Sequence, residues 1–159
     1  MLLKTKDYFC PTANKVNLFK TMVSKYYADT SIWIDLYEDR KGYNDEPLGD
    51  YAIKLFYFIR EKNHKLIITD TLIKELGVYY STAEINGMMK PFEDLIEKVF
   101  VTKKQSKEAD KLVMERKLPL GDVLHSLLAR DNNLILITRD KHFKELRDIS
   151  KFYKPEELI

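Results

Sequence analysis

The sequence predicts an α/β fold, with a mainly parallel sheet of about five strands and helices on both faces. Short aliphatic and aromatic runs alternate along the chain with longer segments whose apolar residues recur at helical spacing. Strands joined through helices pair in parallel by right-handed crossovers, so their carboxyl ends share one edge of the sheet. With 159 residues, 45% of them hydrophobic, the chain is expected to form one domain with a substantial core.

The first strand and the first helix of this pattern meet at Asp29. The run Tyr26–Ala28 is short and aromatic, as in a buried strand, whereas Ile32 and Leu36 have the spacing of one helix face. A loop rich in Gly, Asn, Asp and Pro (41–49) follows. The next segment, "YAIKLFYFIREK", is predicted to be a helix, because its apolar residues again recur at helical spacing.

The middle of the chain is expected to supply the second and third strands. "KLIIT" (65–69) predicts a strand, and "DTLIKELGVYY" predicts the helix after it. "TAEINGMMKPFEDLIEKV" has helical spacing but is interrupted near Gly87 and Pro91. "FVT" (100–102) is the candidate third strand, and the charged segment "SKEADKLVMERK" is predicted to be a helix.

The last part of the chain is predicted to contain a strongly amphipathic helix and two more strands. In "LPLGDVLHSLLARD" the stripe comprises Leu120, Val123, Leu124, Leu127 and Leu128, while Asp122, Ser126 and Arg130 lie away from it. "NLILIT" predicts the fourth strand, "DKHFKEL" a short helix and "ISKFY" the fifth strand.

Composition excludes several classes of protein. Net charge is +2, from 27 basic and 25 acidic residues, so nucleic acid has to be held by a local basic patch. Cys10 is the only cysteine, which excludes an intrachain disulfide and a Cys-rich zinc site and favours a reducing compartment. No apolar stretch reaches the roughly 20 residues that span a bilayer, and the N-terminal segment lacks the apolar core of a secretory signal. We therefore expect a soluble, cytoplasmic protein without a membrane partner.

Acidic residues are expected to gather at the carboxyl edge of the sheet, where open parallel sheets bind ligands. Asp29 follows the first strand, Glu75 lies one turn into the helix after the second, Asp122 begins the helix before the fourth, and Asp140 follows the fourth. Taken singly, each has a structural explanation, as a helix N-cap, a partner of a helix dipole or an exposed acid. Taken together, converging carboxylates repel one another unless a cation joins them, and hard oxygen ligands suit Mg²⁺ or Mn²⁺.

The segments "YADTSIWIDLYE", "ITDTLIKEL", "LPLGDVLHSLLARDNNLILITRDKHF" and "KPEEL" together resemble a PIN domain, the nuclease domain of VapC-type toxins and of many archaeal proteins. The resemblance extends from about Lys25 to Ile159. It implies a PIN-like three-layer α/β/α sandwich, a divalent metal, and endonucleolytic cleavage of RNA that leaves 5′-phosphate and 3′-hydroxyl ends.

The resemblance also assigns roles to individual residues. The metal-binding and catalytic acids are Asp29, Glu75, Asp122 and Asp140, and the small polar supporting positions are Thr30, Ser31 and Thr138. Glu84 on a neighbouring helical segment is the alternative to Glu75. We prefer Glu75, because it closely follows a strand and lies in "TLIKEL", as the acid of the family does.

Other polar and aromatic residues near this edge have more than one interpretation. His125 and His142 are expected to be hydrogen-bonded for structural reasons, with a general-base or supporting role for His125 as the alternative. Flanking basic residues that can neutralise RNA phosphates are Arg130, Arg139, Lys141 and Lys144. A solvated helix face is expected at Asp35, Glu38 and Asp39, and core or dimer contacts at Trp33, Tyr37, Phe56 and Phe58.

The leading functional hypothesis is a Mg²⁺- or Mn²⁺-dependent endoribonuclease, the toxin of a VapBC-type pair, held in check by a small antitoxin. The alternatives are an RNA-processing PIN nuclease without an antitoxin and a non-catalytic RNA-binding PIN domain. A phosphatase of the haloacid dehalogenase type requires a second acid two residues after the first, whereas Asp29 is followed by Thr30 and Ser31. Apolar and aromatic residues between 51 and 100 also favour a homodimer.

Residues 1–24 are predicted to form an extension ahead of a nuclease domain at 25–159. "MVSKYYADTS", from Met22, resembles an ordinary PIN N-terminus, so we expect residues 1–21 to lie outside the core and to precede the natural start. Deleting 1–21 should therefore leave the melting temperature unchanged in a thermal denaturation experiment. A large drop would mean that this segment packs on the core.

Overall fold

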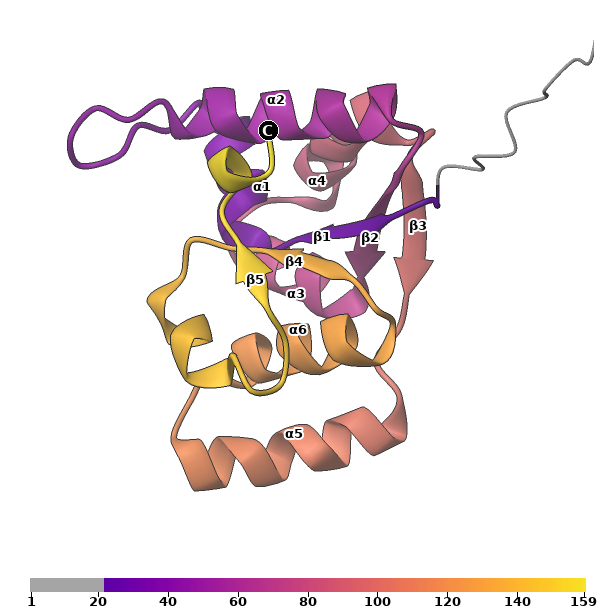
Figure 1. The fold of residues 1–159 in the computed structure, drawn as a ribbon, viewed down its shortest axis with the longest axis vertical. Helices are drawn as coiled ribbons and strands as arrows, with labels where there is room; N and C mark the ends of the chain where they lie inside the picture. Colours follow the sequence, from indigo (N-terminus) through magenta and orange to yellow (C-terminus); the bar gives the residue numbers. More distant parts are fainter. Residues whose placement is uncertain (1–21) are drawn as a thin grey trace, which may run out of the picture.

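The computed structural model of the chain describes residues 22–159 (Figure 1). Cys10 and nearly all of the predicted extension at 1–24 lie outside the described residues, so the domain boundary stays a prediction. Within the described range, no helix combines the length and the apolar character that crossing a bilayer requires.

The described residues form one five-stranded sheet with the order β3-β2-β1-β4-β5, and every strand pair is parallel. The strands are β1 (Lys25–Ala28), β2 (Lys65–Thr69), β3 (Ile96–Val99), β4 (Ile135–Ile137) and β5 (Phe152–Tyr153). The α-helices are α1 (Thr30–Tyr37), α2 (Leu48–Glu61), α3 (Asp70–Tyr79), α4 (Thr82–Met89), α5 (Lys103–Arg116) and α6 (Leu120–Asp131). The 3₁₀ helices are η1 (Lys90–Phe92), η2 (Lys141–Leu146) and η3 (Pro155–Glu157). The predicted α/β class with a five-stranded sheet is confirmed.

Helices cover both faces of the sheet, and each face has its own hydrophobic core. Successive strand residues point to opposite faces, so Tyr26 and Ala28 of β1 join one core and Tyr27 joins the other. The first core includes residues of α1, α2, α3 and α4, with Trp33 and Phe56 fully buried. The second includes residues of α5, α6 and η2. The result is a three-layer α/β/α arrangement (Figure 1).

The third strand was predicted in the wrong place. β3 is Ile96–Val99 and pairs with β2 from Leu66↔Ile96 to Thr69↔Val99, whereas 100–102 is not a strand and Phe100 is exposed. The helix predicted over this segment stops at Met89, and Pro91 lies within the separate 3₁₀ helix η1. Proline lacks the N–H that helix continuation requires, which frees the following residues to pair with β2.

Helix α6 is more buried than its sequence pattern predicted. It lies between the sheet and α5 (Figure 1), so it is covered on two sides. Ser126, predicted to lie off the apolar stripe, is fully buried, as is His125. Leu120, predicted within the stripe, is instead exposed at the first turn.

The strand order places a switch point at the carboxyl ends of β1 and β4. The chain builds β1, β2 and β3 outward in one direction and then crosses back to add β4 on the other side of β1. The backbone N–H of Asp29 donates to the carbonyl of Ile137 at 3.0 Å, which joins the two strand ends. A crevice beyond such a switch point is where open α/β sheets bind ligands.

Candidate metal centre

Asp29 begins α1 directly after β1 and is buried there. Its Oδ1 accepts hydrogen bonds from the Ser31 hydroxyl at 2.6 Å, from the Ser31 backbone N–H at 3.0 Å and from the Ile32 N–H at 3.4 Å. Burial raises the pKa of the Asp29 carboxyl, although these bonds and one with the Thr138 side chain oppose that shift. Asp29 is therefore an N-cap whose carboxylate is fixed at the switch point.

Two of the predicted acids come together with a histidine on the other side of the switch point. The ligand atoms of Asp122, Asp140 and His142 all lie within 4.8 Å of one another. Nδ1 of His142 is 3.1 Å from Asp122 Oδ2 and 3.3 Å from Asp140 Oδ1. Asp140 also caps η2, because its Oδ1 accepts the backbone N–H of His142 at 2.9 Å.

Asp122 has the electrostatic character of a cation site. Burial, and secondly the charge of Asp140, raise the pKa of Asp122 to about 6. Donor atoms around a divalent ion of the size of Mg²⁺ lie about 3 Å apart when adjacent, since each is about 2.1 Å from the metal. Nδ1 of His142 is hydrogen-bonded to Asp122, so the candidate oxygen ligands here are the Asp122 and Asp140 carboxylates, whose ligand atoms lie within 4.8 Å of each other. The donors present therefore fit a small divalent cation.

Glu75 reaches the site from α3 and is held by two partners. Its Oε2 accepts from the Thr30 hydroxyl and lies 2.9 Å from Nε2 of His125. Burial raises the pKa of Glu75, but these partners outweigh the burial, so the pKa lies below its usual value. A Cβ on Gly121 would lie 1.9 Å from Oε1 of Glu75, so the glycine makes room for this carboxylate.

The alternative acid, Glu84, lies elsewhere and has another role. Its carboxylate accepts the Ser81 backbone N–H at 2.8 Å and forms the capping box that starts α4. It is exposed, and these bonds lower its pKa. The preference for Glu75 is consistent with this geometry.

The four predicted acids do not all fall within one tight group. Asp122 and Asp140 do, whereas Asp29 and Glu75 are linked to them through intermediate residues. The Asp140 N–H donates to Thr138 Oγ1 at 3.0 Å, and Thr138 also bonds Asp29. The His125 imidazole bonds Glu75 at 2.9 Å and shares α6 with Asp122.

Part of this arrangement was not predicted from the sequence. His142 was not assigned to the acid group, although its position two residues after Asp140, across a capped turn, was a usable signal. His125 shares a helix with Asp122, as expected, but its partners Tyr27 and Glu75 come from elements far away in the sequence. Nothing local in the sequence reveals those contacts.

The predicted basic residues divide into two pairs. Nε of Arg139 is 2.8 Å from Asp35 and Nη1 is 2.8 Å from Glu156. Arg130 contacts both carboxylate oxygens of Glu108, at 2.7 and 2.9 Å, and also Asp131. Both arginines therefore have carboxylate partners within the chain, whereas Lys141 and Lys144 are exposed. Asp35, expected on a solvated face, is buried against Arg139, so that expectation was wrong.

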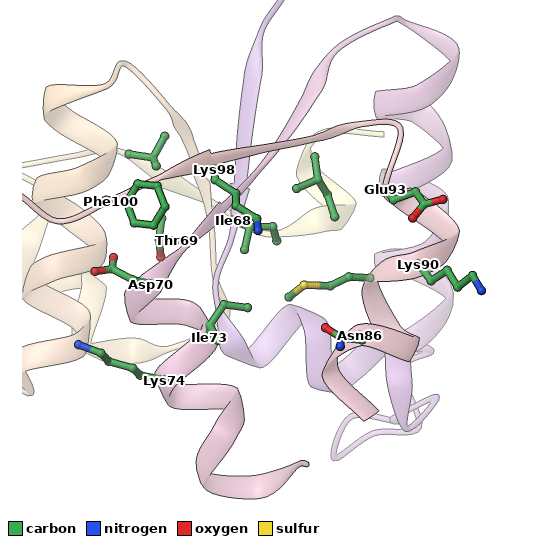
Figure 2. A pocket seen from close by; sticks show the side chains of 13 residues that line it. Ile68, Thr69, Asp70, Ile73, Lys74, Asn86, Lys90, Glu93, Lys98 and Phe100 are labelled. Carbon is green, nitrogen blue, oxygen red and sulfur yellow. The ribbon is translucent and has the colours of Figure 1, made fainter. Parts of the chain in front are cut away.

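A hollow surface extends from Glu75 towards the edge strand β3. A cavity of about 440 Å³ is lined by Glu75, Gly121 and Lys74, among others. A larger one, of about 930 Å³, lies between α3, α4 and β3 and shares Asp70 and Lys74 with the first. Figure 2 shows its apolar floor, with Lys74, Lys90 and Lys98 around it.

Comparison with solved structures identifies the fold as PIN-like. The VapBC2 complex from Rickettsia felis, bound to a promoter DNA fragment, matches with a TM-score of 0.60 and 16% identity over 82% of this chain and 98% of its own. A toxin–antitoxin complex from Klebsiella pneumoniae matches with a TM-score of 0.58 and 20% identity over 82% and 97%. PAE2754 from Pyrobaculum aerophilum matches with a TM-score of 0.52 and 20% identity over 86% and 95%. No family model and no curated protein matches the sequence. The predicted resemblance to a PIN domain is thus confirmed at the level of the fold.

Proposed function

We propose that this protein is a metal-dependent endoribonuclease that hydrolyses phosphodiester bonds of RNA. The observation that carries the proposal is the group of Asp122, Asp140 and His142 at the switch point, with the pKa of Asp122 raised to about 6. Asp29 is connected to this group through Thr138, which bonds both Asp29 and the Asp140 N–H. Glu75 bonds His125, which shares α6 with Asp122. A site in which a partly buried carboxylate, Asp122, is repelled by a neighbouring one, Asp140, is suited to a cation.

In the proposed mechanism, Asp29, Glu75, Asp122 and Asp140 hold one or two Mg²⁺ or Mn²⁺ ions. When bound, such ions lower the pKa of water and neutralise charge on the scissile phosphate and the leaving oxygen. Polar side chains of the protein hold the metal-binding carboxylates in position. Ser31 and Thr138 fix Asp29, and Thr30 fixes Glu75.

Exposed lysines are proposed to bind the RNA backbone. Lys141 and Lys144 lie on η2, directly after Asp140, and are exposed. Arg130 and Arg139 were expected to share this role, but bringing them to RNA requires them to leave their carboxylate partners. The proposal therefore rests on the lysines, which act by neutralising phosphates.

The biological role we propose is that of a toxin restrained by a small antitoxin. Support comes from the structures with a similar fold, two of which are toxin–antitoxin complexes. A short neighbouring reading frame that encodes a DNA-binding protein would favour this role over an RNA-processing nuclease that has no antitoxin. Homodimer formation stays a prediction, which light scattering tests: a monomer mass at tens of micromolar would contradict it.

Incubation of the purified protein with RNA tests the proposed activity. Cleavage is expected with Mg²⁺ or Mn²⁺, is expected to stop when EDTA is added, and should return when excess metal is restored, because the carboxylates act through the ion. Cleavage that survives EDTA would contradict the proposal. RNA binding without cleavage under any of these metals would instead favour a non-catalytic RNA-binding domain.

A further inference from the structure

A buried chain of hydrogen bonds runs through the centre of the molecule to Glu75. Thr69 Oγ1 is 2.7 Å from the Tyr27 hydroxyl, the hydroxyl bonds Nδ1 of His125, and Nε2 of His125 is 2.9 Å from Glu75. Thr69, Tyr27 and His125 are each at most 1% exposed. The four residues come from β2, β1, α6 and α3, so the chain ties together the elements around the site.

The hydrogen-bonding capacity of these groups fixes the direction of the last bond. An ionised Glu75 carboxylate only accepts, so Nε2 of His125 has to carry a proton and donate it. In a neutral ring, Nδ1 then accepts a hydrogen bond from the Tyr27 hydroxyl. In a doubly protonated ring, Nδ1 instead donates a hydrogen bond to the Tyr27 oxygen. Thr69 satisfies Tyr27 in both cases, because a hydroxyl both donates and accepts. In either protonation state, therefore, the His125 ring presents an N–H to Glu75.

The Glu75 carboxylate is thereby held from two directions. The Thr30 hydroxyl and the His125 ring both bond Oε2, while Oε1 lies over Gly121. The His125 ring itself is oriented by Tyr27 at its other nitrogen and lies edge-on to the Tyr27 ring, with centroids 5.3 Å apart. A glutamate side chain that is free to rotate loses conformational entropy when it binds a metal. Because Thr30 and His125 already fix Glu75 in the folded protein, metal binding costs less entropy.

We propose that His125 is a positioning residue: oriented by Tyr27, it fixes the carboxylate of Glu75 for the divalent cation. The proposal rests on the proposed function, because it concerns the same metal site, and it does not require His125 to touch RNA or metal. Residues that hydrogen-bond to a metal ligand and orient it typically contribute about 10–100-fold to metal affinity. The structure assigns that role to a Tyr27–His125 pair that the residue pattern alone did not reveal.

A double-mutant cycle on Mn²⁺ affinity tests this role. The affinity is measured by titration calorimetry on metal-free protein for the wild type, His125→Leu, Glu75→Gln and the double variant. In the wild-type background, His125→Leu is expected to weaken Mn²⁺ binding by about 10–100-fold. In the Glu75→Gln background it should have little further effect, because its influence passes through Glu75. His64→Gln, which removes a hydrogen-bonded histidine outside the site, is expected to leave the affinity unchanged.

Nitrogen-15 NMR of the His125 ring in the metal-free wild type gives a second readout. Nε2 is expected to be protonated, and Tyr27→Phe should weaken Mn²⁺ binding by less than His125→Leu does, because it removes only the partner at Nδ1. An unprotonated Nε2, or an equal loss from His125→Leu in both backgrounds, would overturn the role of His125. A wild type that binds no Mn²⁺ would instead overturn the metal site, so the two failures are distinguishable.

Discussion

Asp140→Asn is expected to lower metal-dependent RNA cleavage by more than about a hundredfold, since even residues that merely orient a metal ligand contribute up to that much. The melting temperature should hold or rise. Asparagine keeps an oxygen that accepts the His142 N–H, the 2.9 Å bond that caps η2. It loses the negative charge that helps to raise the pKa of Asp122. The variant therefore keeps the cap of η2 and loses the repulsion between residue 140 and Asp122, so the folded state is not destabilised. The metal, in contrast, loses a charged ligand.

Asp148→Asn is a matched control for this experiment. Asp148 follows the same 3₁₀ segment and pairs on the surface with Arg116, at 2.7 and 2.8 Å. Removing its charge is expected to leave cleavage unchanged and to have little effect on stability, because exposed ion pairs contribute little. Cleavage rates are measured at saturating Mn²⁺ or Mg²⁺, and melting temperatures in metal-free buffer. Full activity of Asp140→Asn would show that Asp140 only caps η2.

The sequence was sufficient to predict the edge of the sheet at which Asp29 and Asp140 lie. Once the strands at 26–28 and 133–138 are recognised, the rules for parallel crossovers put Asp29 and Asp140 at one edge. The strand at Ile96–Val99 was harder, because four residues of "IEKV" carry too little periodicity to separate strand from helix. Its identity as a strand comes from pairing with β2, which is a contact distant in sequence.

The hydrogen-bonded partners within the site could not be predicted in the same way. Tyr27 and His125 are 98 residues apart, and Glu75 and His125 are 50 apart. Periodicity places a side chain on a face, but which polar groups meet depends on the packing of α6 against the sheet and on rotamers. For the same reason His125 looked like an ordinary structural histidine until its two partners were known.

The contact between Arg139 and Asp35 is also distant in sequence and could not be predicted. Here it weakens an expected role, because it occupies an arginine that was expected to bind RNA. An arginine directly after a strand at the carboxyl edge of the sheet was a reasonable candidate for binding RNA, and Asp35 was a reasonable surface acid. The fold brings these residues, 104 apart in sequence, to a contact of 2.8 Å, with Asp35 only 2% exposed. Glu156, from η3 near the end of the chain, is the second partner of Arg139. The C-terminal segment is thereby joined to α1 beside the site.

Asp35→Ala is expected to lower the free energy of unfolding by about 3 kcal/mol, the lower end of the cost of breaking a buried ion pair, because Glu156 remains with Arg139. Burial raises the pKa of Asp35 in spite of Arg139 and Arg40. Burial lowers the pKa of Arg139, but Glu156 and Asp35 outweigh it and raise that pKa. The two upward shifts have opposite meanings, because a raised pKa disfavours the charged form of Asp35 and favours that of Arg139. The loss arises because the variant leaves the largely buried Arg139 without one of its two carboxylates.

Urea denaturation monitored by the fluorescence of buried Trp33 measures this effect. Asp94→Ala removes the exposed partner of Arg60, whose ion pair has a similar length of 2.9 Å, and is expected to cost much less stability than Asp35→Ala, because exposed ion pairs contribute little. Equal, small losses in the two variants would show that Arg139 finds water or another partner when Asp35 is absent. In that case the guanidinium is free enough to reach RNA, and the original expectation for Arg139 would regain support.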